Sequence, residues 1–483
     1  MSKSKKPFQK LEKTLKGIAF VSGTLAIVFA ALNAHQSPLL NSEGPKEEAP
    51  TATAAPIALS VTPTTSASVV APVAPAPAPA YHDVPLFDRE RVLSDMNRRI
   101  PDDFLIPPGL QQRVGFWFDI YSRYDSHKRV IHHVLYPWVV YKVVDVEPII
   151  NTDFPKFRWQ RNQVADKLVK EEMQKVRVAL KRLASKKKSQ LADAHLNPDE
   201  IQVRDALLSL GGDVRRRAKE ALREVRVQTG QRNFFAEGLQ TAPRYLPTME
   251  EIFKKHKLPI ELTRLPLVES SFNKHAKSKV GAAGIWQFME STGRSQKLVV
   301  NNIIDERKSP FKATDAAARL LKENHMILGR SWELAITAWN HGPGGIKKAS
   351  RAVGSKDLAR IIEVYHSRTF DFASENFFSE FLAALYTERY SDIIFPGLPR
   401  QDAVNLHEVT VSRKMKVDEI LNATGLSKEE FSNINPDLAK FVASKQPLYR
   451  GLRIHVPTDS KSAVDFLMAG DRKRKSRVIG AND

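Results

Sequence analysis

Residues 261–289 read ELTRLPLVESSFNKHAKSKVGAAGIWQFM and decide how the rest of the chain is interpreted. Glu269 stands in this stretch among the apolar residues Leu265, Val268 and Phe272. Apolar surroundings disfavour the ionised form of a carboxyl group and so raise its pKa. A glutamate in such a setting can stay protonated near neutral pH and act as a general acid. We interpret Glu269 as a catalytic acid in a sugar-binding cleft, followed by a glycine-containing turn that lets backbone approach a ligand.

The size and composition of the chain limit the classes of protein that it can be. A chain of 483 residues is too long for one ordinary hydrophobic core, so two or three folded units joined by linkers are expected. The net charge of +20 favours a polyanionic environment, such as nucleic acid, acidic lipid headgroups or an acidic cell-wall polymer. The absence of cysteine excludes a disulfide scaffold, a Cys-liganded zinc site and a thiol nucleophile. No motif indicates a metal, nucleotide or redox cofactor.

The N-terminal residues 1–35 have the pattern of an export segment. Lysine occupies six of the first 16 positions, and residues 17–34 are uncharged and mostly apolar. The pattern is typical of a secretory signal or of a short uncleaved membrane anchor, and a buried core helix is the less favoured alternative. Basic residues before the segment predict that the rest of the chain lies outside the membrane, in the periplasm or cell envelope. Residues 36–80 are rich in Ala, Pro and Thr and are expected to form a disordered linker.

Residues 81–230 are expected to form a mostly helical extension. The apolar density of residues 116–146 predicts a helix followed by one or two strands. Residues 164–226 are predicted to be helical and basic. One apolar stripe on this helical region consists of Val169, Met173, Val176, Leu180 and Leu183.

Two features of the extension have possible functional interpretations that we do not favour. Asp125, His127, His132 and His133 could be metal ligands, but their spacing matches no standard pattern, so a structural cluster is the better interpretation. The basic runs at 186–188 and 215–217 could contact nucleic acid, although such runs usually form a solvated helix face. Because the export segment also disfavours it, no nucleic-acid partner is expected.

The compact domain is predicted over residues 231–395 and is helical by its periodicity. Thr248 is expected to cap one helix. Pro266 is expected to kink the helix that carries Glu269, and a helix boundary at this proline is the alternative. Ser309 and Pro310 are expected to begin another helix. The last helix is expected to have one apolar stripe that faces the core. This stripe consists of Phe377, Phe378, Phe381, Leu382 and Leu385.

Two further stretches, GAAGIWQF at 281–288 and AITAWNHGPGGIKKA at 335–349, complete a recognisable constellation. Glu269 with Ser270 and Phe272, the Gly284–Gln287 motif, and Asn340 with two following glycines occur in a characteristic order. In these motifs residues 232–390 resemble the soluble lytic transglycosylase family, and within it the membrane-bound lytic murein transglycosylase D group.

The resemblance implies a mainly α fold with a lysozyme-like α+β catalytic domain, and Glu269 as its single acid/base. It also implies a glycan groove lined by Ser278, Gln287, Met289, Trp339 and Asn340. The substrate implied is the peptidoglycan glycan strand, cleaved at the β-1,4 bond between N-acetylmuramic acid and N-acetylglucosamine to leave a 1,6-anhydro end. One carboxyl group suffices for this chemistry, because the sugar's own 6-hydroxyl replaces an activated water.

Three positions depart from the family pattern. Trp339 stands where the family usually has Tyr, while Ala373 and Phe377 stand where many members have Glu and Tyr. An alternative register places the missing Tyr at Phe378. These departures leave a non-catalytic peptidoglycan-binding scaffold open as an alternative. A lysozyme-like hydrolase stays open as a rival within the same chemistry.

The C-terminal residues 404–458 resemble a lysin-motif module with a strand, two short helices and a strand. They lack the Gly-Asp-Thr-Leu type of turn after the first strand, so an α+β packing unit is the alternative interpretation. Residues 459–483 are expected to form a disordered basic tail that could contact acidic polymer or lipid.

Overall fold

The computed structural model describes residues 87–469. The predicted export segment and linker, and the basic run at 472–477, lie outside the described residues. Within residues 87–469, no helix combines the length and the apolar character that a membrane span requires.

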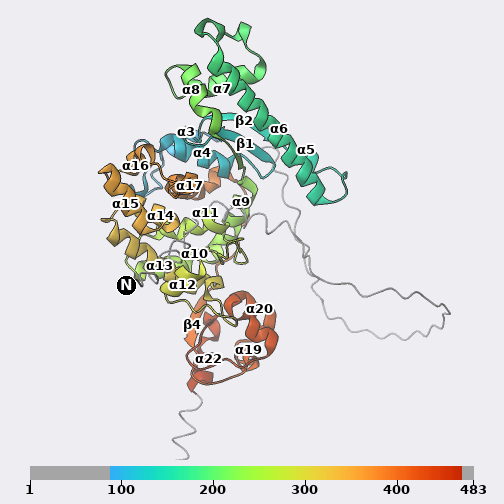
Figure 1. Ribbon diagram of the computed structural model, residues 1–483. Helices are drawn as coiled ribbons and strands as arrows, with labels where there is room; N and C mark the ends of the chain where they lie inside the picture. Colours follow the sequence, from blue (N-terminus) through green and yellow to red (C-terminus); the bar gives the residue numbers. More distant parts are fainter. Residues whose placement is uncertain (1–86, 470–483) are drawn as a thin grey trace, which may run out of the picture.

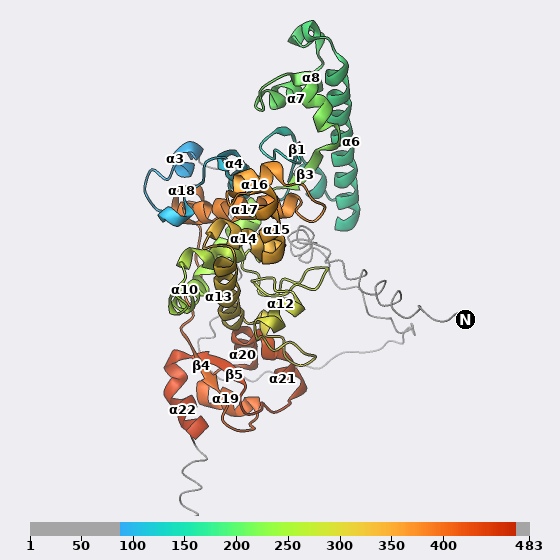
Figure 2. The ribbon, with the colours of Figure 1, turned by 60° about the vertical axis from the view of Figure 1, so that its left-hand side comes forward.

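The described chain is mainly helical, as expected, and Figures 1 and 2 show an arm, a helical body and a C-terminal module arranged along one direction. The arm and its base contain α3 (Arg89–Leu93), α4 (Gln111–Ser122), β1 (Lys128–His133), β2 (Val140–Asp145), α5 (Glu147–Ile150), α6 (Arg158–Ser185), α7 (Pro198–Leu208), α8 (Val214–Glu220) and β3 (Val225–Thr229). The body contains α9 (Arg232–Thr241), α10 (Leu246–Lys255), the 3-10 helix η6 (Ile260–Arg264), α11 (Leu265–Ser270), α12 (Glu290–Ser295), the 3-10 helix η7 (Glu306–Lys308), α13 (Pro310–Ile327), α14 (Trp332–His341), α15 (Pro343–Val353), α16 (Leu358–Val364), α17 (Phe372–Arg389) and α18 (Ser391–Ile394). The module contains β4 (Leu406–Thr410), α19 (Val417–Thr424), α20 (Lys428–Ile434), α21 (Ala439–Ser444), β5 (Arg453–Pro457) and α22 (Lys461–Ala469).

The predicted helix and two strands within residues 116–146 are confirmed as α4, β1 and β2. The three-stranded antiparallel sheet has the order β2-β1-β3, with Val130 of β1 opposite Val143 and Gln228. The prediction of helix through residue 226 is wrong at its end, because β3 begins at Val225. Alternating β-branched residues in VRVQT suit a strand that pairs with the central β1, and this local preference ends the helical region.

Two hydrophobic clusters support the arm and the body. The first runs from Val92 to Phe395 and combines α4 with the helices of the body, so its packing crosses residue 231, where the catalytic domain was expected to begin. The second lies between the sheet and the helices of the arm and includes Val169, Val176, Leu180 and Leu183 of the predicted stripe. The domain boundaries drawn from sequence stay a prediction.

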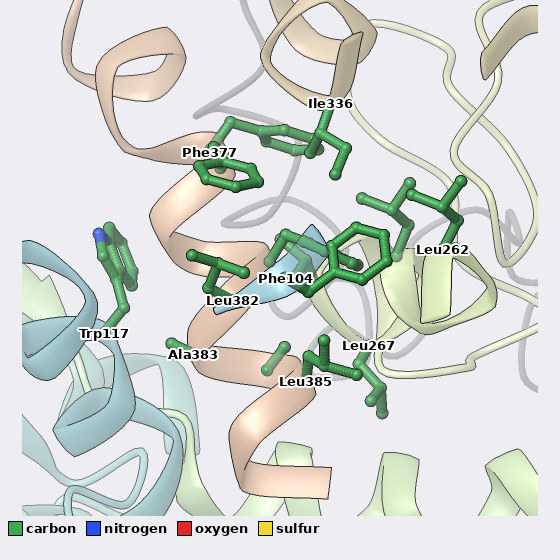
Figure 3. Close-up of a cluster of buried hydrophobic side chains, with 14 of the residues drawn as sticks. Phe104, Trp117, Leu262, Leu267, Ile336, Phe377, Leu382, Ala383 and Leu385 are labelled. Atoms are coloured by element: carbon green, nitrogen blue, oxygen red, sulfur yellow. The ribbon is translucent and has the colours of Figure 1, made fainter. Parts of the chain in front are cut away.

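Helix α17 lies in the middle of the first cluster. Every residue from Phe372 to Thr387 is buried, as expected for a helix that is surrounded by other helices. Figure 3 shows Phe377 and Ile336 of α14 in the same part of this cluster, and Trp117 of α4 on the other side of α17. The ring centroid of Phe104 lies 5.7 Å from that of Phe381 of α17. The predicted aromatic stripe is therefore core packing.

Two local helix predictions in the body are wrong. Helix α10 begins at Leu246 with Pro247 in its first turn, two residues before the expected cap at Thr248. Pro266 causes no kink, because it stands in the first turn of α11, where a missing backbone N–H costs nothing. The predicted helix start at Ser309 and Pro310 is observed at α13.

The C-terminal module has the expected order of strand, helices and strand, with a third helix, α21, before β5. Strands β4 and β5 are antiparallel, with Val409 opposite Ile454. The region expected to be a basic tail contributes α22, whose Val464 is buried in the core of the module.

Candidate active site

Glu269 lies in the only full turn of α11, immediately before the chain leaves the helix through Ser271 and Phe272 with left-handed backbone angles. The residue is 2% exposed. Burial raises the pKa of its carboxyl group to about 8, against a smaller lowering effect from the indole of Trp339. Glu269 is therefore mostly protonated near neutral pH, as the apolar neighbours in the sequence predicted.

Trp339 from α14 is the hydrogen-bond partner of Glu269. Its indole Nε1–H donates to Glu269 Oε1 at 2.8 Å. Its ring centroid lies 5.5 Å from that of Trp286 and 5.2 Å from that of Phe288, so α14 and the 281–288 turn meet beside the acid. At this departure from the usual Tyr, the indole of Trp339 supplies a hydrogen-bond donor to the acid.

The 281–288 turn is held against α11 and η7 by three kinds of contact. Ser270 Oγ donates to the carbonyl of Ile285 at 2.8 Å. Arg307 donates to the carbonyls of Gly281 at 2.8 Å and Phe288 at 3.2 Å. Gly284 has a φ of +78°, and a Cβ there would lie 1.9 Å from the carbonyl oxygen of Arg307. The glycine thus permits the close approach that fixes the turn beside Glu269.

Of the other predicted groove residues, Gln287 lies on this turn, Ser278 and Met289 flank it, and Asn340 lies on α14. Ser278 Oγ accepts from the Ala282 N–H at 2.9 Å, and Gln287 Nε2 donates to the Gly284 carbonyl at 2.7 Å. Gln287 Oε1 is buried and has no hydrogen-bond partner among the described residues, which leaves an acceptor beside the turn. Met289 is 37% exposed. Only Trp339 of the predicted set has a contact with Glu269 that the structure records.

Asn340 connects α14 with α17. Its Oδ1 accepts from Ser374 Oγ at 3.2 Å, and the same hydroxyl lies 3.0 Å from His341 Nδ1. The side chain is therefore positioned by α17 rather than by Glu269.

Sequence reasoning missed a second buried acid, Glu380. Burial raises the pKa of this α17 residue to about 8, the negative charge of Glu269 adds to the rise, and Arg226 opposes it. Burial is the main cause of the raised pKa of Tyr121 in α4. The negative charges of Glu380 and Glu269 raise this pKa further. The available signal was a lone acid in the apolar run FFSEFLAALY, because glutamate is rarely buried without a role.

Phe377 and Ala373, which replace the expected Tyr and Glu, are both buried in the core. The acids that follow Glu269 in sequence are used in ion pairs. Asp305 pairs with Arg307 at 2.8 Å, Glu306 with Lys312 at 3.3 Å, and Asp315 with His256 at 2.7 Å.

Asp125, His127, His132 and His133 of the arm form separate local contacts and not one cluster. The buried His132 has its Nδ1 2.9 Å from the His133 carbonyl oxygen, and Asp125 accepts from the His127 backbone N–H at 2.8 Å. Within residues 87–469, no three His, Asp or Glu side chains are grouped so that they could hold a metal ion.

Comparisons with known proteins point to one family. Residues 249–362 match the family model described as Transglycosylase SLT domain. Membrane-bound lytic murein transglycosylase D of Escherichia coli strain K12 is 40% identical over 96 residues, which are 20% of this chain and 21% of the relative, and the protein of strain O6:H1 gives the same values. The putative tributyltin chloride resistance protein of Alteromonas sp. strain M-1 is 30% identical over 128 residues, 26% of this chain and 62% of that protein. The chain therefore carries a transglycosylase SLT domain and is related through it to the lytic transglycosylases.

Proposed function

We propose that this chain is an exported peptidoglycan lytic transglycosylase. In this proposal it cleaves the β-1,4 bond between N-acetylmuramic acid and N-acetylglucosamine and leaves 1,6-anhydro-N-acetylmuramic acid ends. The observation that carries the proposal is the buried Glu269, which is protonated near neutral pH and receives one N–H bond from Trp339. The SLT domain match over the same residues supports the substrate class.

Glu269 acts first as the acid and then as the base. It donates its proton to the glycosidic oxygen, the C1–O bond breaks, and positive charge develops on the muramic acid ring. The resulting carboxylate accepts the proton of the 6-hydroxyl while O6 forms a bond to C1, which closes the anhydro ring and restores the protonated acid. The Trp339 N–H stabilises the carboxylate between these two steps, because a donor bonded to a charged acceptor contributes more than one bonded to a neutral acceptor.

A lysozyme-like hydrolase is the second candidate, because Glu380 is a second buried carboxyl group close enough to Glu269 to interact with its charge. Hydrolysis needs a base that takes a proton from water. With a pKa of about 8, Glu380 is mostly protonated near neutral pH and is a poor base there. The electrostatics of the pair therefore support transfer to the internal hydroxyl over attack by water.

Product analysis of purified sacculi separates these functions. The wild-type chain is expected to release fragments with anhydro ends, and mass spectrometry detects them as products lighter by one water than hydrolysis products. Reducing ends in their place would establish the hydrolase. Binding to sacculi without any released product would establish a scaffold.

Glu269→Gln is the matched inactive variant. The amide is nearly isosteric with the carboxyl group, but it cannot donate a proton and then remove one. We expect the variant to keep the circular dichroism spectrum of the wild type and to release no anhydro fragments. Retained cleavage would contradict the single-acid mechanism.

Location in the periplasm or cell envelope, with attachment to a membrane if residues 1–35 are not removed, belongs to the same proposal. It rests on the lysines that precede the apolar residues 17–34. Sequencing the N-terminus of the protein from fractionated cells tests it. A chain that starts near residue 35 indicates cleavage, an intact start in the membrane fraction indicates an anchor, and recovery in the cytoplasm contradicts export.

A further inference from the structure

The loop between α5 and α6, together with the first turn of α6, exposes three large aromatic side chains within six residues. Phe154 is 83% exposed, Phe157 56% and Trp159 58%. We call residues 154–159, FPKFRW, the aromatic tip. Single exposed apolar residues are common on protein surfaces, but a contiguous group of this kind marks an interaction site.

The aromatic tip lies at one end of the long helix α6, apart from α11 and α14, which carry Glu269 and Trp339. Figures 1 and 2 both show the start of α6 beyond the sheet and away from these helices. The tip is therefore free to bind a partner without occupying the candidate active site.

The tip also carries positive charge. Lys156 and Arg158 are exposed and have no ion pair within the described part of the chain, and Asp153 is the nearest acidic residue in sequence. Arg161 has a different role, because its Nη1 donates to the carbonyls of Pro155 at 3.0 Å and Lys156 at 3.1 Å. These bonds hold the loop in a defined shape that presents rings and cations together.

The combination of rings and cations selects the kind of partner. The transfer of exposed Phe and Trp side chains from water to the boundary between lipid headgroups and acyl chains is favourable. Adjacent Lys and Arg side chains pair with lipid phosphates. A purely polar acidic polymer would pair with the cations and leave the rings in water. We propose that the aromatic tip docks on an acidic phospholipid surface, with Phe154, Phe157 and Trp159 inserted at the interface and Lys156 and Arg158 over the phosphates.

This contact is distinct from the predicted N-terminal segment and from peptidoglycan binding. A small interfacial site binds membranes weakly and reversibly alone, and two linked membrane contacts give stable attachment. The tip would thus set the position of the arm relative to a bilayer, whichever way residues 1–35 are processed.

Quenching of tryptophan fluorescence by brominated lipid tests the insertion directly. The full chain is mixed with vesicles of phosphatidylcholine alone or with added phosphatidylglycerol, and brominated chains report which tryptophans enter the bilayer. We expect quenching on the anionic vesicles for the wild type and its loss in Trp159→Phe, which keeps a ring for binding but removes the reporter. Trp332→Phe, a matched change at a tryptophan stacked on His325, is expected to keep the quenching. Equal quenching of the wild type and Trp159→Phe would overturn the proposal.

Vesicle sedimentation separates insertion from simple charge attraction. The triple variant Phe154→Ser, Phe157→Ser, Trp159→Ser is expected to bind anionic vesicles at least about tenfold more weakly than the wild type, because it loses the apolar transfer. Lys156→Glu with Arg158→Glu is expected to remove the preference for anionic vesicles. If the triple variant binds like the wild type while the charge variant does not, the contact is electrostatic only and the proposed insertion is wrong. Because the altered side chains are exposed, both variants are expected to keep the wild-type circular dichroism spectrum.

Discussion

Glu269 can donate a proton only while it is protonated, so its raised pKa sets the alkaline limit of the proposed reaction. We expect kcat/KM for glycan cleavage to be level through neutral pH and to fall about tenfold per unit above pH 8, which a pH–rate profile measures. The same shift makes the folded state prefer the protonated acid. The contribution of Glu269 to the free energy of unfolding therefore falls progressively as the pH rises from 4.5, the ordinary pKa of a glutamate, towards 8, its pKa in the folded state. A fall of activity centred near pH 5 would contradict this environment.

Trp339→Phe isolates the indole N–H. The ring is kept, but the 2.8 Å bond to Glu269 is lost, and with it the effect that lowers the pKa of the acid. We expect kcat to fall by about tenfold to a hundredfold and the alkaline limb to move to higher pH, because the carboxylate formed in the reaction loses its donor. Trp332→Phe is the matched control at the start of the same helix. An unchanged limb with full activity would show that the indole only packs.

Glu380→Gln tests whether the second acid takes part in the chemistry. Burial, not Glu380, is the main cause of the raised pKa of Glu269, so the variant is expected to keep anhydro products and an alkaline limb near pH 8. Glu375→Gln is the control on the same helix, at an acid whose pKa burial raises to about 7. A shift from reducing to anhydro ends on removing Glu380 would instead show that Glu380 activates water in the wild type.

Single residues differ in how far sequence could predict them. Leu265 and Val268 are on the same helix as Glu269, and Phe272 follows directly after that helix, so the burial of Glu269 could be predicted from the local pattern. Trp339 was expected in the groove, but the direction of its N–H depends on how α14 packs against α11. Glu380 was missed because the effect of Glu269 on its pKa arises only from the packing of two helices that are distant in sequence.

The 281–288 turn depends on one close backbone approach. In Gly284→Ala the new Cβ would meet the Arg307 carbonyl at 1.9 Å, so either the turn or η7 must move. We expect a loss of about 2 kcal/mol or more in the free energy of unfolding, together with a loss of activity. Denaturant titration and turnover measure the two effects.

Gly281→Ala is the control for this turn. Gly281 also has a positive φ, but no atom lies within 4 Å of a Cβ built there. The difference between the two variants therefore reports the close approach and not the backbone angle. Equal losses would mean that the contact with Arg307 does not hold the turn.

Among the helices and strands, the sequence predicted most clearly those features that a local pattern determines. Ser309 and Pro310 mark the start of α13 because a proline suits the first turn of a helix. The same preference explains the error at Pro266, which was placed inside a helix although it begins one. Strand β3 was missed because its pairing with β1, across the whole of α6 to α8, outweighed the helical pattern before it.

The packing also joins parts of the protein that are far apart in the sequence. Helix α4 belongs to the predicted extension, yet Arg113 and Trp117 both donate to Asn376 of α17, at 2.9 and 3.0 Å. The extension therefore supports the helix that carries Glu380. No local pattern could show this, because each side chain looks like an ordinary core residue in its own segment.

Lys312 joins the SLT domain to the C-terminal module. Its side chain is fully buried, and Nζ lies 2.6 Å from Asp437 Oδ2, 2.7 Å from the Arg453 carbonyl and 3.3 Å from Glu306. A buried ion pair contributes little net stability while it is intact, but removal of one partner leaves an uncompensated charge in the interior. Removal of the Lys312 cation is therefore expected to weaken the attachment of the module to α13.

Lys312→Met is expected to cost about 3–5 kcal/mol in the free energy of unfolding and to detach the module from the body, since Glu306 and Asp437 lose their buried cation. Denaturant titration measures the loss, and faster proteolysis between residues 395 and 406 reports the detachment. Lys440→Met is the control, because this exposed lysine reaches the same interface through the Asn302 carbonyl. Adding Asp437→Asn to Lys312→Met should recover part of the loss, because it removes one of the stranded charges. If Lys312→Met is as stable as Lys440→Met, apolar contacts alone hold the module, and the buried charges have no part in joining it to the SLT domain.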